Sequence, residues 1–211
     1  DDSDIVLNQK GGRASDEVLF KILKDLRKEI AKSKGVPPFV VFQDPSLEDM
    51  TLQYPISMEE LHNVVGVGQG KAKRYGQPFL DVIIQYVEEN DIERPEDFVV
   101  KSIVNKSGSK VSIIRNIDKK LPLEDIAKAQ GKKIEELITE IEAIVASGTK
   151  INIDYHLNEL LDEDAQEEIF EYFMDDADTD SIEAALIEFD EDYTEEELKL
   201  MRIKFMSEVG N

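Results

Sequence analysis

A glycine-rich loop at residues 66–71, with the sequence GVGQGK, is the feature that most restricts the folds open to this chain. A Walker A phosphate loop ending at this lysine would need Gly at position 65 and Ser or Thr at position 72, where the chain has Val65 and Ala72. A dinucleotide-binding fingerprint would need Gly where Lys71 stands, and a strand before the loop. The loop therefore argues against a nucleotide-binding α/β fold and predicts a tight turn between two helices.

The segments on both sides of this loop have the periodicity of helices. Residues 16–34 place apolar side chains on one stripe, and the opposite face carries four lysines, Lys21, Lys24, Lys28 and Lys32. This lysine face is either an ordinary solvated surface or a surface for phosphate. Gly35 and the following Pro37-Pro38 pair exclude helix directly after residue 34. Further helices are predicted at residues 44–54, 57–64, 71–76 and 78–89, so the first half should be a bundle of five helices.

The glycine-rich loop fits the hairpin of a helix–hairpin–helix unit. Gly66 and Gly68 permit positive φ and leave backbone N–H groups uncovered at a helix N-terminus, where one backbone phosphate can bind. Lys71, Lys73 and Arg74 would add positive charge beside it. The alternative is a plain turn between helices whose basic side chains are solvated.

Residues 16–90 resemble the HRDC domain, the helicase-and-RNase-D C-terminal module. The resemblance rests on the segment VPPFVVFQD at residues 36–44, on Leu47, Met50, Pro55 and Leu61, and on the GVG hairpin followed by Lys71 and Tyr75-Gly76. It implies a five-helix auxiliary module that binds nucleic acid weakly, with a bias to single-stranded or branched DNA. Some HRDC domains instead bind proteins.

The resemblance also assigns candidate nucleic-acid-binding residues. They are Gly66, Gly68, Lys71, Lys73, Arg74, Phe39 and, on the lysine face, Lys28. Phe39 follows the proline pair, where an exposed aromatic ring could stack on a base. It could equally lie in the core, for which Val41 and Phe42 are better candidates.

The second half of the chain predicts a helix-turn-helix. Helices are expected at residues 111–119, 123–130 and 134–146, and residues 150–154 alternate as in a short wing-like strand. The outer face of the third helix offers Glu135, Glu136, Glu140 and Glu142, which phosphates would repel. Structural or protein-binding use is therefore favoured over base readout. Three more helices are predicted at residues 162–174, 181–189 and 195–208, the last with Thr194 and Glu197 as a capping box.

This half resembles the helix-turn-helix domain that follows the HRDC domain at the C-terminus of some bacterial RecQ-type helicases. The matching features are the array Leu-x-x-Ile-Ala…Gly…Ile-x-x-Leu-Ile and the final helix containing Tyr-Thr-x-x-Glu-Leu. The predicted fold is all-α. Its expected organisation is an HRDC domain at residues 10–92, a linker at 93–110, and an acidic helix-turn-helix-containing domain at 111–211.

Charge limits the partners of the chain. The net charge of −22 argues against a protein-wide attraction to nucleic acid. Residues 94–133, however, carry ten Lys and Arg against five Asp and Glu, while residues 151–198 hold twenty Asp and Glu and no Lys or Arg. DNA contacts should therefore be local. No apolar run is long enough for a membrane span and there is no Cys, so we expect a cytoplasmic protein without membrane contact.

No residue pattern indicates catalysis or metal binding. The triplet Asp176, Asp178 and Asp180 imitates the start of an EF-hand loop, but the sixth position is Ser181 and the twelfth is Ile187. His62 and His156 lack ligand spacing. We therefore expect no cofactor and no enzymatic activity in this fragment, with ATP and Mg²⁺ belonging to the implied parent helicase.

The resulting hypothesis is a non-catalytic C-terminal fragment of a RecQ-family DNA helicase. The chain begins at Asp1 rather than Met, which agrees with a fragment of a longer protein. Its role would be to modulate DNA substrate engagement in replication, recombination or repair, with DNA and the helicase core of the same chain as partners. The alternative is a protein-interaction or autoregulatory module whose acidic tail binds a basic partner surface.

Overall fold

The computed structural model describes residues 14–95 and 106–211, and these two ranges contain helices and no strand. The all-α prediction is therefore confirmed. The helices are α1 (Glu17–Lys34), α2 (Pro38–Val41), α3 (Asp44–Gln53), α4 (Met58–His62), α5 (Gln69–Glu89), α6 (Lys106–Asp118), α7 (Leu123–Ala129), α8 (Ile134–Ala146), α9 (Asp154–Leu160), α10 (Glu163–Glu171), α11 (Ile182–Glu188) and α12 (Glu195–Gly210), with a π-helical turn at Tyr172–Asp176.

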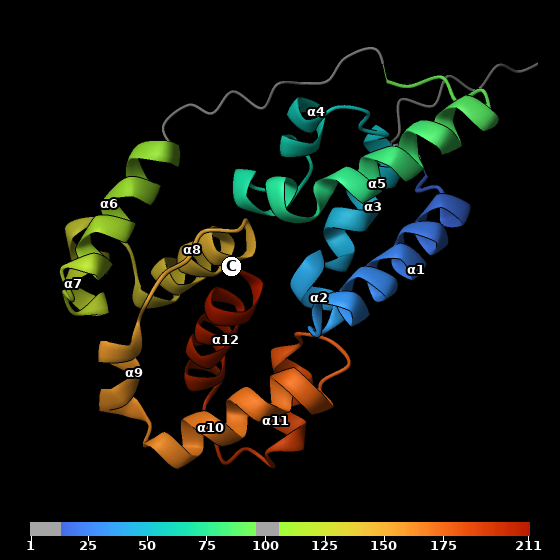
Figure 1. The fold of residues 1–211 in the computed structure, drawn as a ribbon. Coiled ribbons are helices and arrows are strands. Elements are labelled where there is room, and N and C mark those ends of the chain that lie inside the picture. Colours follow the sequence, from blue (N-terminus) through green and yellow to red (C-terminus); the bar gives the residue numbers. More distant parts are fainter. Residues whose placement is uncertain (1–13, 96–105) are drawn as a thin grey trace, which may run out of the picture.

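The N-terminal half, residues 14–95, packs α1 to α5 around one apolar core (Figure 1). Helix α1 begins where the Asp16 carboxylate accepts a hydrogen bond from the Leu19 amide, and it ends at Gly35, whose φ of 66° is left-handed. The Asp16 carboxylate also accepts hydrogen bonds from the hydroxyls of Tyr54 and Tyr86, so the cap ties α1 to α3 and α5. The predicted five-helix bundle is present.

Two predictions in this half were wrong. Residues 71–76 and 78–89 form one continuous helix, α5, with Pro78 inside it. Pro78 lies on the exposed side of α5, and the buried Phe79 and Ile83 hold the helix to the core despite the lost backbone hydrogen bond. Gly76 does not end a helix: a Cβ there would lie 2.5 Å from Leu61 Cδ2, so the glycine lets α4 and α5 approach closely. The second error is α2, which begins at Pro38 because proline suits the first position of a helix.

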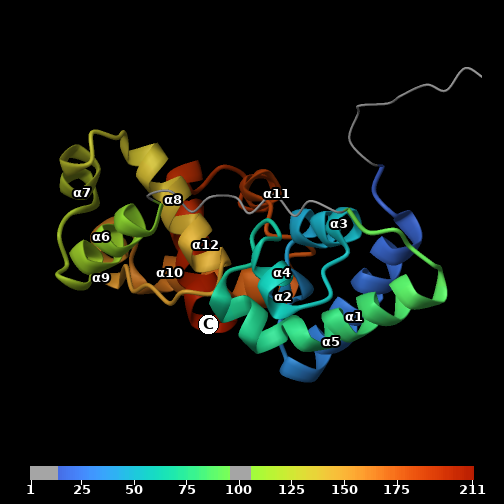
Figure 2. The same ribbon diagram turned by 90° about the horizontal axis from the view of Figure 1, so that it is seen from above.

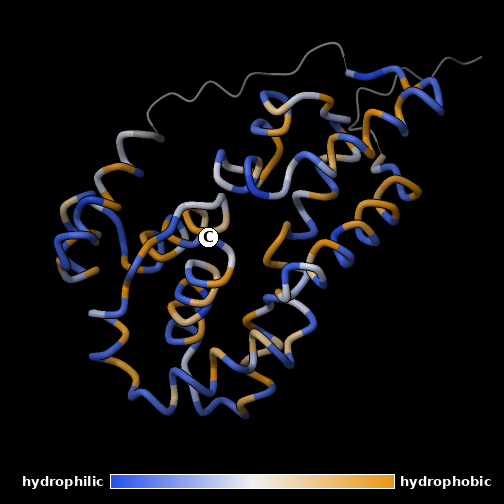
Figure 3. The backbone as a smooth tube through the Cα atoms, in the orientation of Figure 1, coloured by the Kyte–Doolittle hydropathy of each residue, from blue (hydrophilic) through white to orange (hydrophobic). Residues whose placement is uncertain are grey.

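The C-terminal half, residues 106–211, is built around α12. This helix is buried on nearly all sides and packs against α8, α9, α10 and α11. It begins at the predicted capping box of Thr194 and Glu197. The central position explains why α12 alternates apolar and polar residues without a single apolar stripe (Figure 3). Helices α6, α7 and α8 form the predicted helix-turn-helix, and α6 begins at Lys106, inside the stretch predicted as a linker.

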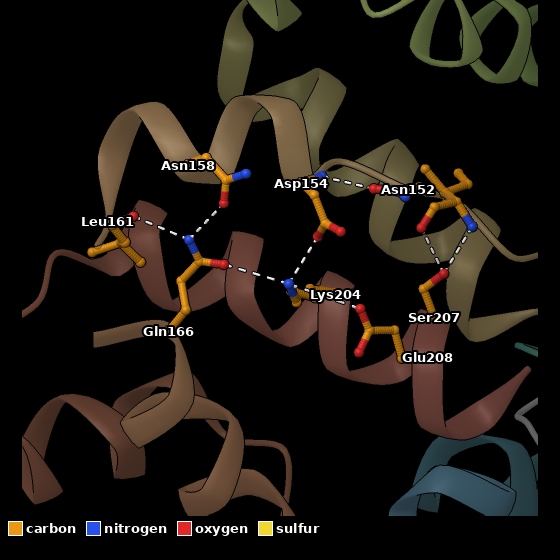
Figure 4. A network of polar contacts seen from close by, with 9 residues as sticks. Asn152, Asp154, Asn158, Leu161, Gln166, Lys204, Ser207 and Glu208 are labelled. Carbon is orange, nitrogen blue, oxygen red and sulfur yellow. Dashed lines mark hydrogen bonds and ion pairs between the residues drawn. The ribbon is translucent and has the colours of Figure 1, made fainter. Parts of the chain in front are cut away.

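The predicted wing-like strand at residues 150–154 is absent from the described chain. Ile151 and Ile153 are both buried, which produces the alternation seen in the sequence. The backbone of Ile151 is bonded to a side chain rather than to a partner strand: the Ser207 hydroxyl accepts from its N–H at 2.8 Å and donates to its C=O at 2.6 Å (Figure 4). Helix α9, which the sequence reading missed, then begins at Asp154, whose carboxylate accepts a hydrogen bond from Lys204 of α12 at 2.9 Å.

The two halves lie against each other along α2, α5, α8 and α12, as both ribbon views show (Figures 1 and 2). Phe39 and Val40 of α2 belong to the apolar core of the C-terminal half, although they are part of the N-terminal half in sequence. The start of α5 meets the turn after α8, close to the C-terminal end of α12. The interface is therefore apolar at α2, and at the start of α5 backbone atoms of the two halves are in contact.

Replacement of Ser207 by Ala should destabilise the C-terminal half. The side chain is 1% exposed, so its loss leaves the N–H and C=O of Ile151 buried without their partner. The expected loss in the free energy of unfolding is about 1–3 kcal/mol, measured by urea denaturation. Ser33→Ala is the control, because the exposed Ser33 hydroxyl bonds only to the Ile30 carbonyl. Equal stability of the two variants would contradict this role of Ser207.

Candidate nucleic-acid interface

The lysine face of α1 is open to solvent. Lys21, Lys24, Lys28 and Lys32 are all exposed and recur every three or four residues along the helix. From the first to the last, their backbone positions span about 16 Å at the rise of an α-helix. The Lys24 ammonium also lies 5.4 Å from the centre of the Phe20 ring. This face can offer several positive charges to one stretch of phosphate backbone.

A groove of about 510 Å³ borders the lysine face. The N-terminal half contributes Lys24 and Lys28 together with Asp25 and Asp44 to its lining, and the loop after the π-helical turn contributes Asp178 and Asp180. The Gln43 side-chain amide donates to the Asp180 carboxylate across the junction of the two halves. The surface beside the lysine face is therefore of mixed charge.

The glycine hairpin is covered by the C-terminal half. Gly66 has the predicted positive φ, 72°, whereas Gly68, the N-cap of α5, has a φ of −90°. A Cβ at Gly68 would lie 2.3 Å from the carbonyl oxygen of Ser147, and a Cβ at Gly70 would lie 2.3 Å from that of Gly148. These contacts correct the expectation that the hairpin is open to a phosphate: in this structure its α5 end faces protein backbone.

Lys71 lies in the interior rather than on the surface where it was expected. Its side chain is 2% exposed and its ammonium donates a hydrogen bond to the Val40 carbonyl of α2. The centre of the Tyr75 ring lies 5.4 Å from the ammonium. The positive charge of Arg74 also acts on the ammonium. Burial, together with the positive charge of Arg74, lowers the pKa of Lys71 from 10.5 to about 7. Lys71 therefore cannot contact DNA in this conformation.

The remaining predicted residues divide into exposed and engaged groups. Lys28 and Lys73 are exposed. The Arg74 guanidinium is bonded to the C-terminal half, where it donates to the Gly210 carbonyl and, at 3.3 Å, to the Asn211 side-chain oxygen. For Phe39, base stacking and a place in the core were both considered; it lies in the core, where it is 5% exposed and its ring centre lies 6.1 Å from that of Phe205. Val41 and Phe42 are buried, as predicted.

The outer face of α8 is acidic, but its glutamates have partners that the sequence did not indicate. The Glu136 carboxylate accepts a hydrogen bond from the Lys133 amide at 2.8 Å and closes the helix N-terminus. Glu140 pairs with Lys132 and Glu142 pairs with Arg202, each at 2.6 Å. Two of the four carboxylates thus hold neighbouring elements in place. The face remains without Lys or Arg of its own, which disfavours placement of α8 in a major groove.

Two further properties concern the described residues only. No helix in residues 14–95 and 106–211 is both long and apolar enough to cross a membrane. In the same ranges, no group of three or more His, Asp or Glu side chains gathers as a metal site would require. The Asp-rich loop at residues 176–180 instead joins the π-helical turn to α11.

The pKa of Lys71 generates a prediction about stability and pH. Between pH 7 and 10.5 the unfolded state carries a proton on this residue that the folded state lacks, so stability rises with pH across this window. The free energy of unfolding of the native protein, relative to that of Lys71→Met, should rise by up to about 1.4 kcal/mol per pH unit. Urea denaturation at pH 7, 8 and 9 measures this difference.

Lys73→Met serves as the matched control, because Lys73 is exposed on the same helix. This variant keeps Lys71, so its stability should rise with pH as that of the native protein does. A difference between the native protein and Lys71→Met that stays constant with pH would show that Lys71 keeps its proton when buried.

Comparison with known proteins agrees with both resemblances. Residues 16–83 match the family model of the HRDC domain, and residues 107–157 match the model of the RecQ-1-like helix-turn-helix domain. The chain is 45% identical over 73 residues to the ATP-dependent DNA helicase RecQ of Bacillus subtilis, which is 35% of this chain and 12% of the relative. It is 40% identical over 79 residues to the protein of the same name from Haemophilus influenzae, which is 37% of this chain and 13% of the relative.

A third protein with this name, from Pasteurella multocida, is 38% identical over 71 residues, or 34% of this chain and 11% of the relative. The chain thus spans about an eighth of the length of the curated relatives it matches. Both matched domains are helical in the structure and occur in the order that the resemblances implied. The two family-model matches and the RecQ relatives together support a RecQ C-terminal region, with an HRDC domain at residues 16–83 and a RecQ-1-like helix-turn-helix domain at residues 107–157.

Proposed function

We propose that this chain is an auxiliary DNA-binding region of a RecQ-type helicase and that the lysine face of α1 is its contact with DNA. The observation that carries the proposal is the row of four exposed lysines on a chain whose net charge is −22. Such a row would bind phosphates rather than bases, so the contact would be insensitive to sequence. The motor of the longer protein would use ATP and Mg²⁺, while this region would modulate how DNA engages that motor during replication, recombination or repair.

The size of the lysine face sets the expected strength of binding. Four side chains along one helix correspond to roughly 2–4 phosphate contacts, with Lys73 a possible addition from α5. For single-stranded DNA each neutralised phosphate contributes about −0.7 to the slope of log K against log salt. Binding should thus be weak and lost at high salt. The acidic C-terminal half would confine DNA to the α1 side, which suits single strands or branch points better than a long duplex.

Charge reversal on α1 tests this proposal. Lys24→Glu combined with Lys28→Glu should abolish the binding of a single-stranded oligonucleotide at low salt, measured by fluorescence anisotropy. For the native protein, the slope of log K against log salt should lie at roughly −1.5 to −3.

The matched control is Lys119→Glu combined with Lys128→Glu, which changes the net charge equally at exposed sites of the helix-turn-helix domain. This control should retain most of the affinity. Loss of binding in the control alone would move the DNA contact to the helix-turn-helix domain. Undetectable binding of the native protein at low salt would contradict the proposal altogether.

A second candidate function is that of a protein-interaction or autoregulatory module. It is favoured by the acidic residues of the C-terminal half, several of which lie exposed in the first turns of α10 and α12. Such a surface would bind a basic partner, with the motor domains of the same helicase as the nearest one. Under this function, neutralising Glu163, Asp164, Glu195 and Glu196 would weaken binding to the separate motor, and reversal of the α1 lysines would not.

A further inference from the structure

We propose that the C-terminal half closes the phosphate-binding end of the HRDC hairpin, and that the turn at Ser147 and Gly148 occupies the place of a DNA phosphate. The chain would then have a docked state, in which DNA reaches only the lysine face of α1, and an undocked state, in which the hairpin also binds a phosphate. This inference rests on the proposed function for the nature of the ligand.

The first support is the close approach of two backbones. Gly68 and Gly70 face Ser147 and Gly148 so closely that a Cβ on either glycine would overlap a carbonyl oxygen. The fit is reciprocal, since a Cβ at Gly148 would lie 2.4 Å from the Lys71 amide nitrogen, and Gly148 has a φ of 107°. The atoms nearest to a Cβ at Gly68, Gly70 or Gly148 all belong to the opposite half, so the close approach is a property of the contact between the halves.

The second support is electrostatic. Helix α5 begins at Gln69, so its N-terminus carries a partial positive charge and amide groups without intrahelical acceptors. Helix α8 ends at Ala146, so the carbonyls at its C-terminus carry a partial negative charge. The Lys71 amide donates a hydrogen bond to the Ser147 carbonyl across the interface at 3.4 Å. A carbonyl oxygen thus takes the position and the sign of charge that a phosphate oxygen would take.

The third support is the use of the hairpin cations. Lys71 and Arg74, which would contact a phosphate beside an open hairpin, donate instead to the Val40 carbonyl and to the Gly210 carbonyl. Val40 belongs to the apolar core of the C-terminal half, and Gly210 to its last helix. The Arg74 bond crosses the interface, so docking and phosphate binding compete for this cation. The Lys71 bond stays within the N-terminal half, but docking covers its ammonium, because a Cβ at Gly210 would lie 3.5 Å from the Lys71 nitrogen.

Gly70→Ala tests the proposal. Gly70 is the second residue of α5, where Ala favours the helix, and the three atoms nearest to its Cβ all belong to Gly148 across the interface. We expect faster hydrogen exchange at residues 69–72 and 145–149. The affinity for single-stranded DNA at low salt should increase by about 5-fold or more. The added affinity should disappear in Gly70→Ala combined with Lys71→Glu. The control is Gly108→Ala in α6, where no atom lies within 4 Å of the new Cβ.

A second variant covers the case in which Gly70→Ala impairs folding. Gln43→Ala removes the hydrogen bond to Asp180 across the interface without changing a cation, and it should shift exchange and affinity in the same direction by a smaller factor. Unchanged exchange at residues 69–72 in both variants would overturn the docking contact. Faster exchange with unchanged DNA affinity would overturn the competition between docking and DNA, while the proposed function stands if Lys24→Glu with Lys28→Glu still abolishes binding.

Discussion

The contact between the N-terminus of α5 and the C-terminus of α8 is the constraint on which the arrangement of the two halves depends. It requires glycine at positions 68, 70 and 148, because only backbones without Cβ atoms can approach this closely. The apolar contact of Phe39 with Phe205 and the hydrogen bond from Arg74 to the Gly210 carbonyl lie along the same interface. These glycines therefore lie at helix ends and also form the contact between the two halves.

This arrangement places the basic residues of the HRDC domain in two different environments. The four lysines of the lysine face remain in water, where they are available to phosphates. On α5, Lys71 is buried and donates to the Val40 carbonyl of α2, and Arg74 donates to the Gly210 carbonyl of the C-terminal half. The acidic helix-turn-helix domain is then better understood as a cover for the hairpin than as a reader of bases. Helix α8 supports this view, because its Glu142 pairs with Arg202 of α12 and the C-terminus of α8 contacts α5.

Much of the fold followed from the sequence because its signals are local. Helix α1 with Gly35, the capping box at Thr194 and the helix-turn-helix spacing all act within a few residues of the chain. The errors arose where tertiary contacts decide. Gly76 was taken as a helix end, but its missing Cβ makes room for Leu61, and the alternation at residues 150–154 reflects burial under α12 rather than a strand. Lys71 was expected on the surface and Phe39 was left open between the surface and the core, because no local pattern reveals that the second half of the chain covers them.

The exchange rate of the Lys71 backbone amide tests the central claim most directly. In a helix whose N-terminus is free, the third amide has no intrahelical acceptor and exchanges rapidly with solvent. In this structure the same amide is bonded to the Ser147 carbonyl and lies within the interface. The account predicts slow exchange at Lys71 in the native protein without DNA, measured by NMR. Rapid exchange, at the rate of an unprotected amide, would contradict it.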